Sequence, residues 1–290
     1  MKGIENLGKI LGLVIALFYF LFFQGNETYE YVFFVLVLVT VGIPHGAVDH
    51  LLVSPHLTKS KLISFLLKYI GIIAIYLIAW FFLPQISLIA FLIMSAYHFG
   101  QSHFIQSEIQ KLKKTTYMLV GGFYLSIILW SDFSYTQKLL SSLINIENLE
   151  SYGPGLIFFT FILSNILTAY NQPSRASFHI LESVVLGFVL YHLPLLLGFI
   201  IYFGFWHALP SMNEEYRSLK KFLGENKRSN FLKKLMPFTA LSLAGMWILL
   251  MLFYPSMTEN ELILLFFILI SLISAPHIWF MNRFLESKKA

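Results

Sequence analysis

The sequence predicts an all-α, polytopic transmembrane bundle, and its composition and apolar patterning carry that prediction. Of its 290 residues, 57% are hydrophobic and only 12% are charged, with a mean hydropathy of +0.72. Soluble globular domains carry about 25% charged residues. Apolar runs long enough to cross a bilayer as helices recur from one end of the chain to the other. We therefore expect a single integral membrane domain over residues 1–290.

The apolar runs divide into ten predicted spans. These spans cover residues 9–24, 31–53, 62–83, 85–105, 116–131, 153–170, 177–192, 194–212, 235–254 and 261–283. Pro84 and Pro194 separate neighbouring runs and predict two tight helical hairpins, because proline ends or kinks a helix. The first run is long enough to span, and no small-residue cleavage site follows it, so we expect a membrane span rather than a cleaved signal.

The loop charges predict how the chain is oriented. Placing the N-terminus in the cytoplasm makes 1–8, 54–61, 106–115, 171–176, 213–234 and the C-terminal tail the inner segments. Every Lys and Arg except Lys138 then lies in or beside an inner segment, which is the positive-inside pattern. This pattern predicts that both termini are cytoplasmic. It also accounts for the net charge of +5 without a nucleic-acid partner.

Histidine-bearing motifs occur in the same half of four predicted spans. The motifs are Pro-His-Gly-Ala-Val-Asp-His at 44–50, Tyr-His-Phe-Gly-Gln-Ser-His at 97–103, Phe-Trp-His at 205–207 and Ala-Pro-His at 275–277. Ionisable residues inside a membrane are costly and mark functional sites. Several imidazoles at one depth predict an intramembrane metal site formed by His45, His98, His207 and His277. The absence of cysteine excludes thiolate ligands, iron–sulfur clusters and cysteine nucleophiles.

Spacing separates the favoured ligands from their neighbours. His45 and Asp49 are four residues apart and would share a helix face, so Asp49 is expected either to bind the metal or to orient His45. His50 follows His45 by five residues, and His103 follows His98 by five, which is about 140° around a helix. One metal is therefore not expected to take both members of either pair. His50 and His103 stay open as outer-shell groups, ligands of a second metal or interfacial residues.

Further polar and aromatic residues surround these motifs. Glu182 lies inside a predicted span and needs a partner, either a ligand histidine or one of Arg175 and His179. Pro44 and Pro276 directly precede histidines and predict kinks that turn side chains toward a cavity. Aromatic residues near the motifs would pack against a flat, conjugated, apolar substrate; they include Tyr97, Phe99, Tyr202, Phe205, Trp206 and Trp279.

Residue chemistry alone leaves several functions open. Histidine coordination suits iron, copper or zinc. No serine–histidine–carboxylate set is evident near the motifs, which favours iron and oxygen chemistry over hydrolysis. A di-iron hydroxylase or desaturase is a rival, although the chain lacks clustered His-x-x-His-His boxes. A haem-binding or metal-binding membrane protein and a transporter are non-enzymatic rivals.

A family resemblance narrows these alternatives. Residues 42–49 (Gly-Ile-Pro-His-Gly-Ala-Val-Asp), the His-Phe-Gly run at 98–100, the Phe-rich run ending in His207 and the Pro-His pair at 276–277 resemble the Brp/Blh family of membrane β-carotene 15,15′-dioxygenases. The resemblance covers essentially the whole chain. It implies cleavage of the central double bond of β-carotene by O2 with Fe²⁺ as cofactor, giving two molecules of all-trans-retinal.

The resemblance also implies roles for individual residues. His45, His98, His207 and His277 would be the catalytic metal ligands, with Asp49 in the first motif. Some members of the family have a second histidine four residues after the one matching His207, where this chain has Ser211. Because that histidine is missing here, we expect His277 to be a metal ligand all the more. We expect the protein in a bacterial inner membrane, with its retinal passed to a microbial rhodopsin.

Overall fold

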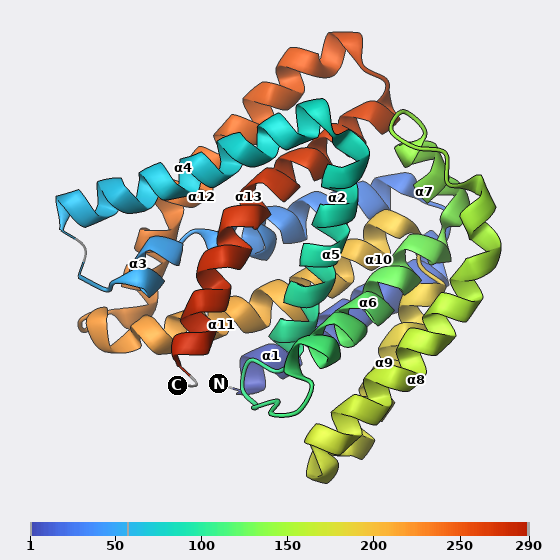
Figure 1. Cartoon of the computed structure of the whole chain (residues 1–290), viewed down its shortest axis with the longest axis horizontal. Coiled ribbons are helices and arrows are strands. Elements are labelled where there is room, and N and C mark those ends of the chain that lie inside the picture. The colour runs from blue at the N-terminus through green and yellow to red at the C-terminus, as the bar shows by residue number, and fades with distance from the viewer. Residues whose placement is uncertain (1, 57, 289–290) are drawn as a thin grey trace. The chain divides into compact units, whose positions relative to one another are not determined.

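The structure is a computed structural model that describes residues 2–56 and 58–288. Most of these residues lie in helices (Figure 1). No strand occurs within those ranges, which confirms the all-α prediction. Position 57 in the predicted inner loop 54–61 and the end of the C-terminal tail lie outside the described residues.

Thirteen α-helices are connected by short turns and by π-helical and 3-10 segments within the described ranges. The helices are α1 (Lys2–Phe18), α2 (Glu27–Val37), α3 (Asp49–Val53), α4 (Lys59–Phe82), α5 (Pro84–His103), α6 (Lys113–Ser131), α7 (Phe133–Leu140), α8 (Gly153–Asn171), α9 (Ala176–Tyr191), α10 (Leu195–Ile201), α11 (Leu209–Leu219), α12 (Lys227–Phe253) and α13 (Glu259–Ser287). The π-helical segments are η1 (Tyr19–Phe23), η2 (Leu38–Gly42) and η6 (Tyr202–Ala208). The 3-10 segments are η3 (Pro44–Gly46), η4 (Glu147–Tyr152), η5 (Pro173–Arg175), η7 (Lys220–Phe222) and η8 (Tyr254–Ser256).

The helix breaks predicted at Pro84 and Pro194 are present, whereas the tight hairpins stay predictions. Helix α4 ends at Phe82, and Pro84 is the first residue of α5. Helix α9 ends at Tyr191, and Pro194 directly precedes α10. Proline suits both positions because the first residues of a helix have no intrahelical acceptor for their N–H groups.

Seven helical segments in the described chain are long and apolar enough to cross a membrane. They coincide with the predicted spans 9–24, 31–53, 62–83, 153–170, 194–212, 235–254 and 261–283. Helices α6 and α7 qualify only together as an eighth, although they are bent by 89° at their junction. Polar residues lower the hydropathy of α5, and α9 has only 16 residues where a span needs about 20. Ten spans and cytoplasmic termini therefore stay predictions.

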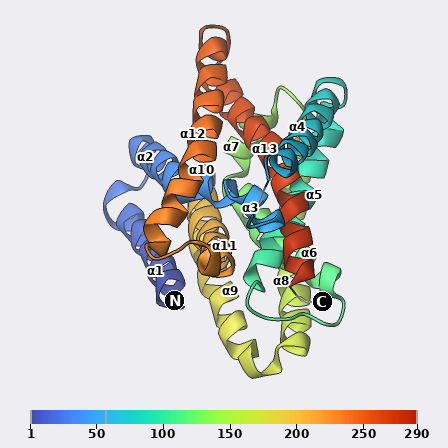
Figure 2. The ribbon, with the colours of Figure 1, turned by 90° about the vertical axis from the view of Figure 1, so that its left-hand side faces the viewer.

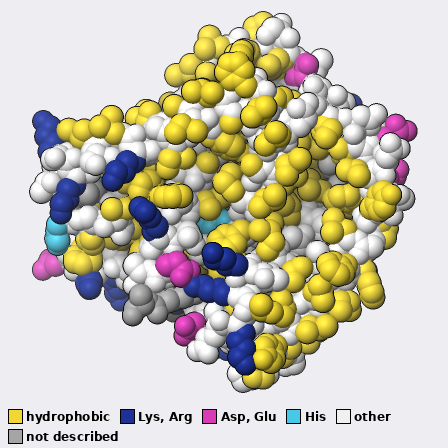
Figure 3. All heavy atoms as spheres, viewed as in Figure 1, with side chains coloured by type: hydrophobic (Ala, Val, Ile, Leu, Met, Phe, Trp, Pro, Cys, Tyr) yellow, Lys and Arg dark blue, Asp and Glu magenta, His cyan; other side chains and the backbone are white. Residues whose placement is uncertain are grey.

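The surface composition indicates an integral membrane protein. Large apolar side chains face outward on many helices, and Phe81 on α4 is 81% exposed. Figure 3 shows hydrophobic side chains spread over the face in view. A soluble monomer rarely leaves extended apolar patches in water, whereas lipid covers them without cost. Contact with lipid is the physical reason for this pattern.

The chain divides into two compact units. Unit 1 comprises Met1–Leu38, Leu92–Ser141 and Asn145–Pro210, and unit 2 comprises Val39–Phe91, Ser142–Ile144 and Ser211–Ala290. In unit 1, every residue of α10 and η6 is buried, and α10 contacts α2 and α6. Helices α6, α8 and α9 of this unit pack against one another (Figure 1). In unit 2, α13 packs against α3, α4 and α12 (Figure 2).

Two glycines let the backbones of α5 and α6 touch inside unit 1. A Cβ atom on Gly121 would lie 1.8 Å from the carbonyl oxygen of Ala96. A Cβ atom on Gly100 would lie 1.8 Å from the carbonyl oxygen of Tyr117. Backbone atoms cannot move aside as a flexible side chain can, so only glycine fits at both positions. This crossing sets the position of the part of α5 that carries His98.

Replacing Gly121 by alanine is therefore expected to lower the free energy of unfolding by about 1–3 kcal/mol or more. A Cβ atom on Gly122 of the same helix would meet no heavy atom within 4 Å, so Gly122→Ala is the matched control and should melt at or above the wild-type temperature. Thermal unfolding of the detergent-solubilised variants measures both effects. Equal melting temperatures for the two variants would contradict the close backbone contact.

Candidate metal centre

Unit 1 holds two of the predicted ligands as a buried pair. His98 lies near the C-terminal end of α5, and His207 lies in η6. Both are almost completely buried, and their ring centroids are 4.7 Å apart at an interplanar angle of 73°. Their candidate ligand nitrogens lie within 4.8 Å of one another. One metal ion of ordinary coordination radius can therefore contact both imidazoles.

Neighbouring polar groups orient these two rings. The Nδ1–H of His98 donates to Oε1 of Gln101 at 3.4 Å. Nδ1 of His207 lies 3.0 Å from Oγ of Ser102. Gln101 and Ser102 are consecutive residues of α5, so one turn of this helix carries a candidate ligand together with the partners of both rings. Phe99 and Phe203 pack against the ring of His207 and surround it with apolar surface.

The π-helical turn η6 determines where His207 lies along its helix. A π-helical turn inserts an extra residue and rotates the side chains that follow it, and such turns occur frequently at functional sites. Gly204 in this turn allows α2 to approach, because a Cβ atom there would lie 2.2 Å from Cγ1 of Val37. The sequence motif predicted the histidine but not the π-helical turn.

Unit 2 holds the other two predicted ligands as a second buried pair. His45 lies in η3 and His277 in α13, with ring centroids 4.7 Å apart at an interplanar angle of 84°. Nδ1 of His277 lies 3.0 Å from each carboxylate oxygen of Asp49. The Nδ1–H of His45 donates to the carbonyl oxygen of Gly42. A Cβ atom on Gly46 would lie 3.2 Å from Nδ1 of His277, so glycine keeps this approach open.

The geometry around Asp49 corrects one expectation. His45 and Asp49 do not share a regular helix face, because α2 ends at Val37 and the chain passes through η2 and η3 before α3 begins at Asp49. Asp49 consequently reaches His277, from a segment 228 residues away, rather than orienting His45. At Pro44, where a kink was predicted, the chain enters the 3-10 segment η3. Pro276 lies inside the continuous helix α13, and its predicted kink stays a prediction.

Three of the four histidines, His45, His98 and His277, share one hydrogen-bonding pattern. A carbonyl or carboxylate oxygen can only accept, so Nδ1 of His45, His98 and His277 carries the hydrogen. The neutral ring then has its lone pair on Nε2, which is the nitrogen available for a metal. Neutral imidazoles held in this way fit iron, copper or zinc. Each unit thus offers two buried imidazoles that could bind a metal ion.

His50 and His103 have mainly aromatic surroundings. The ring of His50 lies 4.6 Å from that of Phe238. Nε2 of His103 lies 3.0 Å from the hydroxyl of Tyr202, and the His103 ring stacks on Tyr124 at 4.9 Å. Both histidines therefore have neighbours that hold them in place without a metal.

The six predicted substrate-contacting aromatics separate into different environments. Phe99 is buried against both His207 and Tyr202. Tyr97 packs against Tyr117 on α6. Phe205 and Trp206 face α1, where Gly12 allows their close approach. Trp279 is 54% exposed, and Arg283 lies 5.0 Å from its ring centroid, so it lies on the surface rather than in the buried centre.

The ion pair and hydrogen bond described for Glu182 involve other residues than a ligand histidine, Arg175 or His179. It forms an ion pair with Lys9 of α1 and accepts a hydrogen bond from Nε1 of Trp206 at 3.0 Å. Trp206 directly precedes His207, so Glu182 ties the histidine-bearing turn to α1 and α9. Sequence reasoning missed Lys9 as the partner of Glu182 because the two residues are 173 positions apart. The available signal was that Lys9 is a charged residue inside the first apolar run, where it too needs a partner.

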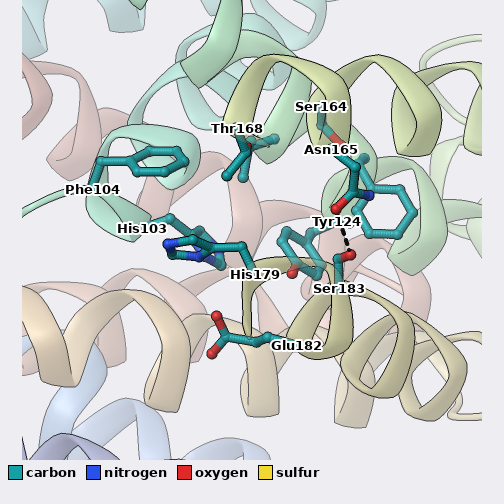
Figure 4. Close-up of a pocket in the computed structure, with 11 residues that line it drawn as sticks. His103, Phe104, Tyr124, Ser164, Asn165, Thr168, His179, Glu182 and Ser183 are labelled. Carbon is teal, nitrogen blue, oxygen red and sulfur yellow. Dashed lines mark hydrogen bonds between the residues drawn. The ribbon is translucent and has the colours of Figure 1, made fainter. Parts of the chain in front are cut away.

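A small polar cavity lies beside this ion pair in unit 1. Figure 4 shows Glu182 and the rings of His103 and His179 at the cavity, with Ser183 and Asn165 joined by a hydrogen bond. Its volume of 20 Å³ is enough for a single water molecule. A cavity of this size is a hydration site and not a chamber for a large apolar substrate.

Glu215 is a buried carboxylate that sequence reasoning missed. It lies on α11 in unit 2, is fully buried, and its oxygens accept no hydrogen bond from the described residues. The sequence placed this residue in the predicted inner segment 213–234, whereas in the structure it lies on α11, which extends to Leu219.

Comparisons with known proteins agree with the histidine pattern. Residues 36–285 match the model of a protein family described as beta-carotene 15,15′-dioxygenase. A curated protein named Beta-carotene 15,15′-dioxygenase, from Uncultured marine bacterium 66A03, is 29% identical over 178 residues. That alignment covers 59% of this chain and 64% of the relative, so the chain spans less than two thirds of the relative's length. No solved structure matches the chain.

All four histidines of the two buried pairs lie within the matched residues, and the match extends over most of the chain. The chain therefore belongs to the beta-carotene 15,15′-dioxygenase family.

Proposed function

We propose that this protein cleaves the central 15,15′ double bond of β-carotene with O2 and releases two molecules of all-trans-retinal. In this reaction the carbon–carbon double bond breaks and each of its carbons receives one oxygen atom of O2. The atoms and electrons balance without an added reductant or a proton. Family membership supports this substrate and reaction.

The observation that carries the proposal is the set of four buried imidazoles with Nδ1 directed at a fixed neighbouring group. We propose that His45, His98, His207 and His277 together hold one Fe²⁺, each through Nε2. When bound, the iron would supply the binding and activation of O2. Asp49, Gln101 and Ser102 would keep the rings in the orientation that the metal requires.

The surroundings of the histidines suit an apolar substrate. Phe99, Phe203 and Tyr202 provide aromatic surface next to His207. A conjugated polyene packs favourably against such rings. β-Carotene dissolves in the bilayer, so we propose that it enters laterally between lipid-facing helices. We further propose a multi-pass location in a bacterial inner membrane, with retinal delivered to a microbial rhodopsin.

The proposed function is tested by pigment analysis of bacterial cells engineered to make β-carotene. Cells that express this chain are expected to lose their orange colour and accumulate retinal, whereas cells with an empty vector keep β-carotene. The iron content of the purified protein is measured in parallel, with one iron per chain expected. Retention of β-carotene despite good membrane expression and supplied iron would overturn the proposal.

The same preparation separates the rival functions. A di-iron hydroxylase or desaturase would bind two irons per chain and yield oxygenated products of unchanged carbon number. A haem-binding protein would show a strong Soret absorbance and leave β-carotene intact. A transporter would leave the total amount of β-carotene unchanged.

A further inference from the structure

The hydrogen bonds of Ser102 determine which nitrogen of His207 carries the hydrogen. A serine hydroxyl has a single hydrogen to donate. Oγ of Ser102 donates it to the carbonyl oxygen of Phe99, at 2.6 Å. The contact of 3.0 Å between Ser102 Oγ and His207 Nδ1 then requires the imidazole to donate. His207 is therefore the Nδ1–H tautomer, with its lone pair on Nε2.

Burial makes this arrangement energetically significant. Ser102 and His207 are 5% and 1% exposed, so water does not replace a lost partner easily. A buried donor left without an acceptor is costly. Loss of the serine oxygen would therefore favour rotation of the ring or transfer of its hydrogen to Nε2. Rotation of the ring would turn the Nε2 lone pair of His207 to another direction, and transfer of the hydrogen would place it on Nε2 and block that lone pair.

From this geometry we infer that Ser102 is a positioning residue for the metal centre, which it serves by holding His207 as the Nδ1–H tautomer. The inference rests on the proposed function, because it assigns Nε2 of His207 to a metal. Two contacts hold this arrangement in place: the carbonyl oxygen of Phe99 accepts the serine hydrogen, and the serine oxygen accepts from the imidazole of His207. Ser102 is not among the four proposed metal ligands.

The protein contains a matched control for this contact. Ser126 on α6 is also buried, and its hydroxyl donates to the carbonyl of Phe123 three residues earlier at 2.9 Å. It reproduces the local geometry of Ser102 within a helix of the same unit. The structure gives it no histidine partner among its hydrogen bonds in the described chain. Alanine at 126 therefore removes the same atoms without touching a candidate ligand.

The test is titration of metal-free, detergent-solubilised protein with Co²⁺ alone, followed by its visible absorption. Ser102→Ala is expected to weaken Co²⁺ binding about 10–100-fold, as losses of ligand-orienting partners do. Ser102→Thr retains an acceptor oxygen and is expected to restore binding to near the wild-type value. Ser126→Ala is expected to bind as the wild type does. Ser102→Cys, with a weak sulfur acceptor of similar size, replaces the alanine variant if that one does not fold.

The outcomes separate this inference from the proposed function. Wild-type affinity in both Ser102→Ala and Ser102→Cys would overturn the inference while leaving the metal centre intact. Equal weakening in Ser102→Ala and Ser126→Ala would also overturn it, since the effect would then be one of packing. Failure of the wild-type protein to bind Co²⁺ or iron would instead overturn the proposed metal centre itself.

Discussion

Replacing His207 by alanine is expected to abolish retinal formation in cells that make β-carotene. The substitution removes one of two imidazoles whose ring centroids are only 4.7 Å apart in a buried pair. Losing a ligand should weaken iron binding by more than the about 10–100-fold that loss of an orienting partner costs. Retinal in the cell extract and iron in the purified protein measure the effect. His98→Ala should behave in the same way, because it removes the other member of the pair.

His192 provides the matched control for the ligand substitutions. It lies at the end of α9, is exposed, and its Nδ1–H donates to the carbonyl of Phe188. His192→Ala is therefore expected to keep wild-type iron content and wild-type retinal production. If His207→Ala retained both iron and cleavage, the assignment of this histidine to the metal centre would be wrong.

The second large effect is expected from Asp49→Ala, although Asp49 is not among the four proposed ligands. Both carboxylate oxygens lie 3.0 Å from Nδ1 of His277, and the side chain is 2% exposed. Removing them leaves the Nδ1–H of His277 without this acceptor and the ring without its orientation. Iron affinity should fall about 10–100-fold, with a parallel loss of retinal.

Asp49→Asn distinguishes orientation from charge. Its amide oxygen can still accept from Nδ1 of His277, but the negative charge is lost. We expect the asparagine variant to retain more iron than the alanine variant when both are loaded at limiting iron and measured by elemental analysis. Full iron occupancy in Asp49→Ala would show that His277 either needs no such partner or is not a ligand.

The sequence alone was sufficient for the class of the fold and for the identity of the histidines. The local sequence contains apolar runs that are long enough to cross a bilayer as helices. The all-α membrane class could therefore be predicted from it directly. The helix breaks at Pro84 and Pro194 could also be predicted from the local sequence, because a proline ring ends or kinks the helix in which it lies. The four motif histidines stood out because an ionisable residue in an apolar run has a high cost wherever the run packs.

Partners that lie far apart in the sequence could not be predicted in this way. The spacing predicted that Asp49 and His45 share one face of a continuous helix. In the structure η2 and η3 interrupt that helix, and Asp49 contacts His277. For Glu182 the sequence predicted Arg175, His179 or a ligand histidine as the partner, yet its ion pair is with Lys9 of α1. Each pairing depends on which helices pack together, and helical periodicity contains no information about that.

The amino-acid sequence determined the membrane class, the helix breaks at Pro84 and Pro194 and the choice of candidate ligand histidines, because each of these depends on composition or on spacing within one segment. Tertiary structure decided which group each histidine contacts through Nδ1. Ser102 is adjacent to the motif residue His103 but serves His207, because Gly100 and Gly121 let α5 approach α6 and fix its position in unit 1. Tautomer and ring orientation follow from such long-range contacts, which form only when distant segments pack.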